Sequence, residues 1–119
     1  MVHANLPNYE KIDKPWGNFE RLTHNEQSTV KLITVTAGNS ISLQSHEHRG
    51  EYWRIISGIG RAIIDEEVIP VEAGVELFIK PTVKHRIEST TDDILFLEIA
   101  FGTFDESDIT RFSDQYGRV

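Results

Sequence analysis

The stretch "GNSISLQSHEHRGEYWRIISG" (residues 38–58) places polar, metal-capable side chains in a run that otherwise reads as β-strand. Successive side chains of a strand point to opposite faces, so Gln44, His46 and His48 are expected on one face. Two histidines at this spacing can chelate one divalent ion. The pair alone is equally consistent with two histidines exposed on an edge strand. The neighbouring residues must therefore decide which side chains are ligands.

A regular spacing surrounds these polar residues. Five residues separate Gly38 from Gln44, one separates Gln44 from His46, four separate His46 from Glu51, and six more lead to the next glycine. This spacing resembles the first motif of the cupin superfamily, with Gln44 in the place of the first histidine. The resemblance implies that Gln44, His46 and Glu51 are metal ligands, and it leaves His48 free for another role.

A second group of residues resembles the second cupin motif. Five residues separate Gly74 from Lys80, which replaces the proline of the motif, and Thr82 replaces its glycine. His85 keeps its place and is implied as the fourth ligand, whereas Ser89 replaces an asparagine. Threonine adopts a positive φ less readily than glycine, so we expect the turn before His85 to differ in shape.

The four implied ligands supply two nitrogens and two oxygens and leave room for water or substrate. Only the carboxylate is charged, so a bound divalent cation would keep the site positive and able to act as a Lewis acid. The chain has no cysteine, which excludes thiolate ligands and disulfides. We expect one divalent ion, with Zn²⁺ favoured, although Mn²⁺, Fe²⁺, Co²⁺ and Ni²⁺ suit the same ligands.

Short runs rich in Val, Ile, Thr and Phe recur along the chain between Gly, Pro, Asn and Asp, which is typical of an all-β fold. The cupin resemblance specifies a double-stranded β-helix, a small barrel like a jelly roll. We expect one domain over residues 1–119, with an N-terminal arm at 1–13 and a tail at 102–119 that folds over the barrel. Strands are expected at residues 18–23, 29–36, 40–46, 51–57, 60–65, 67–71, 76–80, 84–89 and 93–101.

Composition limits the classes of partner. The formal net charge of −7 disfavours nucleic acid and anionic membranes. No segment approaches the ~20 apolar residues of a membrane span, and the N-terminus lacks the apolar run of a signal peptide, so we expect a cytoplasmic protein. The twelve lysine and arginine residues still allow a small phosphorylated ligand to be bound.

Longer phrases resemble the isomerase domain of type II mannose-6-phosphate isomerases. They are "KPWG" (14–17), "ISLQSHEHRGEYW" (41–53), "SGIGRAII" (57–64), "VKHRIES" (83–89) and "SDITRFSDQYGR" (107–118). The resemblance implies interconversion of mannose 6-phosphate and fructose 6-phosphate through a cis-enediol. In that family a guanylyltransferase domain usually precedes this one. It is missing here, so we expect no guanylyltransferase activity.

Three alternatives stay open. The chain can be a cupin that binds a sugar or sugar phosphate without turnover, or an isomerase or epimerase of another sugar. A cupin oxygenase is the third alternative, which Gln44 disfavours because oxygenases more usually have histidine there.

The implied reaction needs a proton carrier and groups that bind the substrate. We expect His48 to move the proton, because an imidazole can do so near neutral pH. Arg49 is expected to stabilise the enediolate or hold a hydroxyl, which requires it to turn inward at the strand end. For the phosphate we favour Arg111, then Lys80 and Arg61, although each is equally consistent with a solvated surface charge.

Two further features bear on the environment of the site. Glu98 lies in the apolar run "ILFLEIAF", so it is either at an exposed edge or directed into the cavity. Ile41 and Leu43 are expected on the face opposite Gln44, which must be covered by the arm with Trp16 or by a second subunit. We therefore expect a homodimer.

Overall fold

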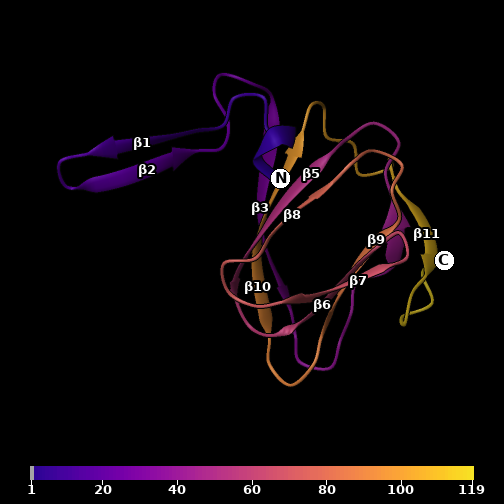
Figure 1. The fold of residues 1–119 in the computed structure, drawn as a ribbon. Helices are drawn as coiled ribbons and strands as arrows, with labels where there is room; N and C mark the ends of the chain where they lie inside the picture. The colour runs from indigo at the N-terminus through magenta and orange to yellow at the C-terminus, as the bar shows by residue number, and fades with distance from the viewer. Residues whose placement is uncertain (1) are drawn as a thin grey trace.

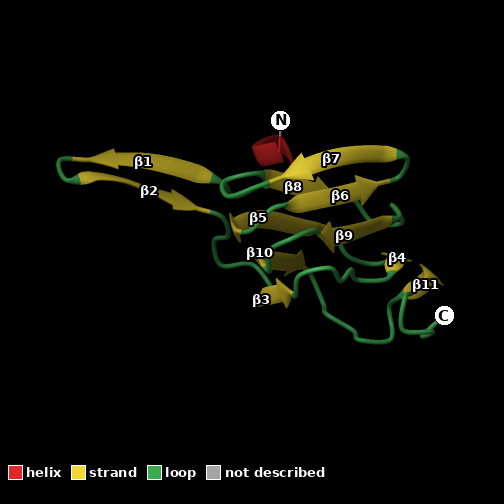
Figure 2. Ribbon diagram, turned by 90° about the horizontal axis from the view of Figure 1, so that it is seen from below, coloured by secondary structure: helices red, strands yellow, loops and turns green. Residues whose placement is uncertain are grey.

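The chain folds into two facing antiparallel β-sheets, and the computed structural model describes residues 2–119. The four-stranded sheet has the order β3 (Ser28–Val35), β10 (Ile94–Phe101), β5 (Glu51–Ser57), β8 (Glu76–Ile79). The five-stranded sheet has the order β11 (Thr110–Ser113), β4 (Leu43–Ser45), β9 (His85–Ser89), β6 (Gly60–Ile64), β7 (Glu67–Val71). Both sheets curve around a common interior (Figures 1 and 2). The all-β prediction is confirmed.

Alternation along the strands decides which side chains fill this interior. On β5, Trp53 and Ile55 point inward and are almost fully buried, whereas Arg54 between them points outward. The inward side chains of both sheets form one apolar cluster between the layers. Its buried members are Val35, Trp53, Ile55, Ala62, Val71, Leu77, Ile79, Ile87, Ile94 and Phe96.

Most predicted strands are present, with small differences at their ends. The ranges 51–57 and 67–71 coincide with β5 and β7. Two strands were not predicted, β1 (Glu10–Lys14) and β11. The sequence of β1, EKIDK, has a single apolar residue and therefore gives no alternating signal.

The largest difference concerns the predicted strand 40–46, of which only β4 remains. After Ser45 the chain leaves the strand, because the carboxylate of Asp108 accepts hydrogen bonds from the backbone N–H groups of Glu47 and His48 (2.8 and 3.0 Å). Strand alternation therefore cannot be extended past Ser45. This early end changes which residues face the interior.

The first residues form a short 3₁₀ helix (Val2–Asn5) and a β-hairpin, in which β1 pairs with β2 (Gly17–Arg21). Residues 10–13 of the expected N-terminal arm therefore form a regular strand, and Met1 lies outside the described residues. Trp16 at the hairpin turn is 73% exposed, and Ile41 lines an interior cavity. The expected outward face of Ile41 and Leu43, covered by Trp16, is therefore not formed. No helix among residues 2–119 is long and apolar enough to cross a membrane.

Candidate functional site

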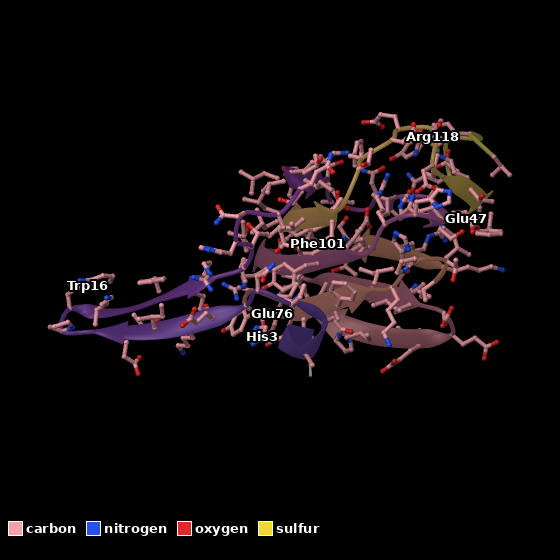
Figure 3. All side chains as sticks on the ribbon, turned by 90° about the horizontal axis from the view of Figure 1, so that it is seen from above. His3, Trp16, Glu47, Glu76, Phe101 and Arg118 are labelled. Carbon is pink, nitrogen blue, oxygen red and sulfur yellow. The ribbon has the colours of Figure 1, made fainter. Side chains whose placement is uncertain are left out.

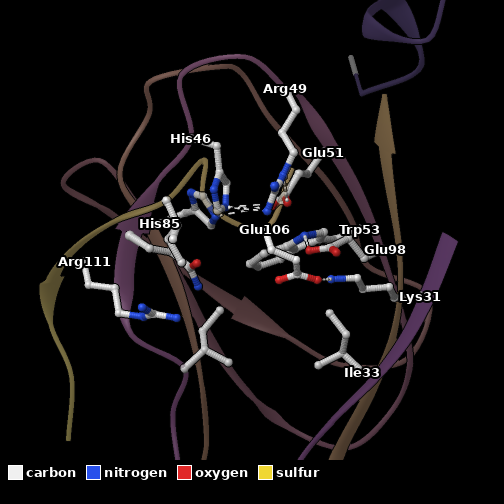
Figure 4. Close-up of a pocket in the computed structure, with 13 residues that line it drawn as sticks. Lys31, Ile33, His46, Arg49, Glu51, Trp53, His85, Glu98, Glu106 and Arg111 are labelled. Carbon is white, nitrogen blue, oxygen red and sulfur yellow. Dashed lines mark hydrogen bonds and ion pairs between the residues drawn. The ribbon is translucent and has the colours of Figure 1, made fainter. Parts of the chain in front are cut away.

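A cavity of about 200 Å³ lies between the two sheets where polar residues replace the apolar core (Figure 4). Arg111 on β11, Gln44 on β4 and His85 on β9 are successive register partners, so their side chains share one face. That face lines the cavity. Lys31, Glu98 and Trp53 form a similar row in the four-stranded sheet and also line the cavity. The remaining lining residues are Ile33, Ile41, His46, Arg49, Glu51, Glu106 and Ile109.

Three of the predicted ligands meet inside this cavity. His46 follows β4, Glu51 begins β5 and His85 begins β9. His46 Nε2 lies 3.6 Å from Glu51 Oε2, and His85 Nε2 lies 3.3 Å from Glu51 Oε1. All three side chains are buried, and one potential ligand atom of each lies within 4.8 Å of the others. The cluster can hold one metal ion.

Backbone carbonyls fix the orientation of both imidazoles. His46 Nδ1 lies 2.7 Å from the carbonyl oxygen of Asp108, and His85 Nδ1 lies 2.9 Å from that of Val83. A carbonyl oxygen only accepts hydrogen bonds, so Nδ1 carries the hydrogen in each ring. In the neutral form of each ring, Nε2 then carries the lone pair and faces Glu51, which is the arrangement that metal-binding histidines have in proteins.

The polar atoms of the cluster fit a cation. Burial raises the pKa of the Glu51 carboxyl, but His85, His46 and Arg49 outweigh this effect and hold the pKa well below its usual value. Burial lowers the pKa of His46, which favours the neutral imidazole that metals bind. In the described chain, neither Glu51 Oε1 nor His85 Nε2 has a hydrogen-bond partner, although both are buried. Such atoms are costly unless a ligand satisfies them.

Gln44 and Thr82 bear on how the cluster is completed. Gln44 lines the cavity and is the register partner of His85, so its side chain lies on the same face of the sheet as His85. Thr82 has a φ of 72°, and its N–H donates to the carbonyl of His46 (2.7 Å). The expected change in turn shape is thus corrected: threonine takes the left-handed conformation that the motif's glycine provides, at a cost of about 1–2 kcal/mol.

Arg49 turns inward, as the sequence required for a role in the site. It is 8% exposed and lines the cavity. Its Nε donates to Glu51 Oε2 (3.0 Å), and a terminal nitrogen makes a longer bond to His46 Nε2 (3.3 Å). Ligation of a metal ion by His46 would replace this long bond. The guanidinium also lies 4.4 Å from the Phe104 ring centroid and donates to the carbonyl of Asp105 (3.3 Å), so the tail holds it.

Three other predicted residues lie outside the cavity. His48 is exposed, which corrects its expected place beside the ligands, because β4 ends before it. Lys80 is exposed in the turn after β8 and does not line the cavity. Arg61 is exposed on β6 and pairs with Glu88 (2.6 Å). The structure therefore gives these three residues no contact with the site.

Arg111 does reach the cavity, and the tail around it forms one wall. Its Nε is buried and has no hydrogen-bond partner among residues 2–119. Across the cavity, Lys31 lies 3.9 Å from Glu106 and 4.3 Å from the Phe104 ring centroid (Figure 4). Lys31 could not be recognised from the sequence as a cavity residue, since both faces of its strand carry apolar residues. Lys31 is already paired with Glu106, so Arg111 is the cation with an unused donor that can meet an anionic group.

Glu98 faces the cavity, which decides between its two sequence-based interpretations. It is 6% exposed and accepts a hydrogen bond from Trp53 Nε1 (3.2 Å). Trp53 also packs its ring edge-on against His85, with centroids 5.6 Å apart. Burial, and then the charge of Glu51, raise the pKa of Glu98 to about 7. Glu98 is thus a carboxyl group able to gain or lose a proton near neutral pH.

In the metal-free protein, obtained by chelation, the contribution of Glu98 to the free energy of unfolding should decrease as the pH rises. Because the folded-state pKa of about 7 exceeds the ordinary 4.5, its contribution is fully present below pH 4.5 and is lost through pH 7. The loss should be on the order of 3 kcal/mol. His46, whose pKa burial lowers, acts in the opposite sense over an overlapping range. The measurement is therefore the difference in urea-unfolding free energy between wild type and Glu98→Gln. A difference that is constant with pH would contradict this assignment.

The facing sheets and the buried histidine–glutamate cluster define a cupin. A cupin 2 conserved barrel domain protein from Rhodopseudomonas palustris superimposes with a TM-score of 0.64 and 23% sequence identity. The match covers 69% of this chain and 57% of that chain. At this identity the likeness shows the fold, and it confirms the predicted cupin barrel.

The family described as "Mannose-6-phosphate isomerase C-terminal" matches residues 3–114, and the chain belongs to it. The chain is 37% identical over 112 residues to a mannose-1-phosphate guanylyltransferase of Salmonella montevideo, a match that covers 92% of this chain. It is 34% identical over 113 residues to the xanthan biosynthesis protein XanB of Xanthomonas campestris, covering 93% of this chain. In both cases the chain spans 24% of the relative's length.

Proposed function

We propose that this chain is a metal-dependent aldose–ketose isomerase that interconverts mannose 6-phosphate and fructose 6-phosphate in the cytoplasm. The observation that carries the proposal is the buried cluster of His46, Glu51 and His85 in a cavity that also presents Arg111. Membership of the mannose-6-phosphate isomerase C-terminal family supports the choice of substrate. The xanthan biosynthesis protein among the relatives supports a role in supplying sugar for polysaccharide synthesis.

In this proposal His46, Glu51 and His85 hold one divalent ion, with the amide oxygen of Gln44 as fourth ligand. Zn²⁺ suits two imidazoles and two oxygens, and Mn²⁺, Fe²⁺, Co²⁺ and Ni²⁺ suit them as well. Such an ion would act as a Lewis acid toward the sugar's carbonyl or hydroxyl oxygen. Arg49, beside Glu51, then lies where it can donate to an oxygen that gains negative charge.

Proton transfer requires a group that faces the cavity and is not a ligand. Glu98 meets both conditions, whereas His48 is exposed. In the direction from mannose 6-phosphate, the Glu98 carboxylate takes the proton from C2 and returns it to C1. In this direction O1 gains a proton as the cis-enediol forms, and O2 loses its hydroxyl proton as the enediol collapses to the ketone, so protons only change places and no external oxidant is needed.

Arg111 is proposed to bind the phosphate, because its buried Nε has no other partner in the described chain. Replacing it by methionine should raise KM for mannose 6-phosphate by about 10- to 100-fold, since one charge-assisted hydrogen bond is lost. The kcat should fall far less. Arg61→Met is the matched control, because Arg61 lies outside the cavity and should leave KM unchanged. Equal KM values for both variants would remove Arg111 from the phosphate site.

The test of the function is a coupled isomerase assay with mannose 6-phosphate, before and after chelation. Turnover that disappears on chelation and returns with added Zn²⁺ or Mn²⁺ is expected. Fructose 6-phosphate should be converted at a comparable rate in the reverse assay. Saturable binding of mannose 6-phosphate without turnover, whichever metal is supplied, would instead identify a binding cupin. Turnover of unphosphorylated mannose alone would identify an isomerase of another sugar.

A further inference from the structure

The tail of residues 102–119 forms one wall of the cavity, although it buries little of its own surface. Its side chains that line the cavity are Glu106, Ile109 and Arg111. Figure 3 places Arg118 of the tail and Glu47, the neighbour of a proposed ligand, at the same end of the barrel. None of the residues 102–119 is buried, so chiefly polar contacts hold the tail in place. Segments with so few buried apolar contacts open more readily than the rest of a fold.

Asp108 connects this tail to the proposed ligand His46 at three points. The Nδ1–H group of His46 donates to the backbone carbonyl oxygen of Asp108 (2.7 Å). The carboxylate of the same residue accepts hydrogen bonds from the backbone N–H groups of Glu47 and His48 (2.8 and 3.0 Å). One residue thus holds both the imidazole and the loop that carries it. The orientation of His46 therefore depends on Asp108 being in place.

Arg49 makes a second connection between the tail and the cluster. Its guanidinium donates to the carbonyl oxygen of Asp105 (3.3 Å), while its Nε donates to Glu51 Oε2 (3.0 Å). The third proposed ligand is oriented by the barrel, because His85 Nδ1 donates to the carbonyl oxygen of Val83 (2.9 Å). The tail therefore acts on the side of the cluster that His46 and Glu51 form.

The proposed ligands are nearly inaccessible to solvent while the tail is docked. His46, Glu51 and His85 are 3%, 1% and 1% exposed. A metal ion needs a path of entry to such a site. The strands that form the other walls carry the buried core, whereas the tail carries no buried residue. Displacing the tail therefore exposes less apolar surface than displacing a strand.

We propose that Asp108 is a positioning residue that couples docking of the tail to binding of the metal ion. This coupling rests on the proposed metal centre but not on the identity of the sugar. With the tail undocked, His46 loses its carbonyl partner and its ring can turn away from the other ligands. With the tail docked, Nε2 faces them, so fixing His46 by ligation also favours the docked position of Asp108. Such coupling is reciprocal: docking raises the metal affinity by the factor by which the metal stabilises docking.

The same coupling extends to the proposed phosphate site. Arg111 follows Asp108 closely in the tail, and it reaches the cavity because β11 pairs with β4. Docking that is favoured by the metal therefore also holds this guanidinium in the cavity. The metal-free chain should accordingly present a less well-formed site for an anionic group.

Titration of the full chain with Zn²⁺ against a chromophoric chelator tests the coupling. Asp108→Ala removes both carboxylate hydrogen bonds and should lower the Zn²⁺ affinity by about 10- to 100-fold, the usual effect of losing a group that orients a metal ligand. Asp108→Asn keeps one acceptor oxygen and should recover part of this loss. Asp114→Ala is the matched control, because that carboxylate bonds to Arg118 within the tail (2.7 Å). Its Zn²⁺ affinity should equal that of wild type.

Hydrogen–deuterium exchange gives the reciprocal measurement. Saturating Zn²⁺ should slow exchange of the backbone amides of residues 108–113 in wild type by roughly tenfold or more, and by much less in Asp108→Ala. Exchange in the core strand β5 should be the same in wild type and variant without metal. This comparison separates a change in tail docking from general unfolding of the variant.

The possible failures can be told apart. Equal Zn²⁺ affinity in wild type and Asp108→Ala, an equal loss in Asp114→Ala, or tail exchange that Zn²⁺ does not slow would each overturn the coupling alone. A wild-type chain that binds no Zn²⁺ would overturn both the coupling and the proposed function. A chain that shows the coupling but does not convert mannose 6-phosphate would contradict only the proposed isomerase.

Discussion

Glu51→Gln and His85→Ala should each strip the bound metal from the protein and lower isomerase turnover by about a thousandfold or more. Lewis-acid stabilisation contributes several kcal/mol to a transition state, and each 1.4 kcal/mol is tenfold in rate. Glu51→Gln also leaves Arg49 buried without its carboxylate partner. Metal content by elemental analysis and kcat/KM for mannose 6-phosphate are the two measurements.

The loop that follows β4 supplies matched controls for both substitutions. Glu47→Gln and His48→Ala are the same two substitutions, made at exposed positions in the loop beside the site. Both should keep the metal and near-normal turnover. His48→Ala also tests the sequence-based expectation that His48 carries the proton. A Glu51→Gln variant that keeps both metal and turnover would show that the cluster does not hold the ion.

The fold followed from the sequence where alternation and turn residues agree. The range 51–57 is bounded by a glycine and alternates inward apolar residues with outward ones, and it coincides with β5. Gly58 has a positive φ, and a Cβ there would collide with the backbone of Asp93, so the glycine was informative. The strand β1 had no such signal, since its charged residues find their pairing partners only in β2.

The site was predictable where spacing sufficed and not where tertiary contacts decide. The motif spacing selected His46, Glu51 and His85, whose side chains lie together in the structure. His48 was misplaced because alternation was extended beyond a strand that the distant Asp108 ends. Arg111 was favoured because it lies in the tail that resembles the family. It reaches the cavity through pairing of β11 with β4, a contact between segments far apart in the chain that no local pattern encodes.

For Lys31 and Glu98, the sequence could not show which face of the strand points into the cavity. Both occupy inward positions in strands whose two faces are apolar, so alternation could not say which face was buried. The N-terminal segment packs against part of the apolar outward face of these strands, and Val30 and Leu32 lie exposed on the rest of it. Apolar residues on both faces of these strands thus hide the signal that would otherwise have assigned these polar residues to the cavity.

Glu98→Gln should lower kcat by about a hundred- to ten-thousandfold, the usual contribution of a general acid–base group, and should leave the metal content unchanged. The substitution keeps the shape of the side chain and its contact with Trp53 but removes the group that takes and returns the proton. KM for mannose 6-phosphate should change little, because Arg111 and not Glu98 is proposed to bind the phosphate.

Hydrogen exchange separates this role from a structural one. Wild-type enzyme turning over in D₂O should introduce deuterium at the carbon that receives the proton. The reason is that the protonated Glu98 carboxyl exchanges its proton with solvent during the lifetime of the enediol. Glu98→Gln should abolish this incorporation together with turnover, and Glu98→Asp, which keeps the carboxyl on a shorter side chain, should restore part of both. If Glu98→Gln loses its metal, or turns over within a few-fold of wild type, the proton is carried by another group.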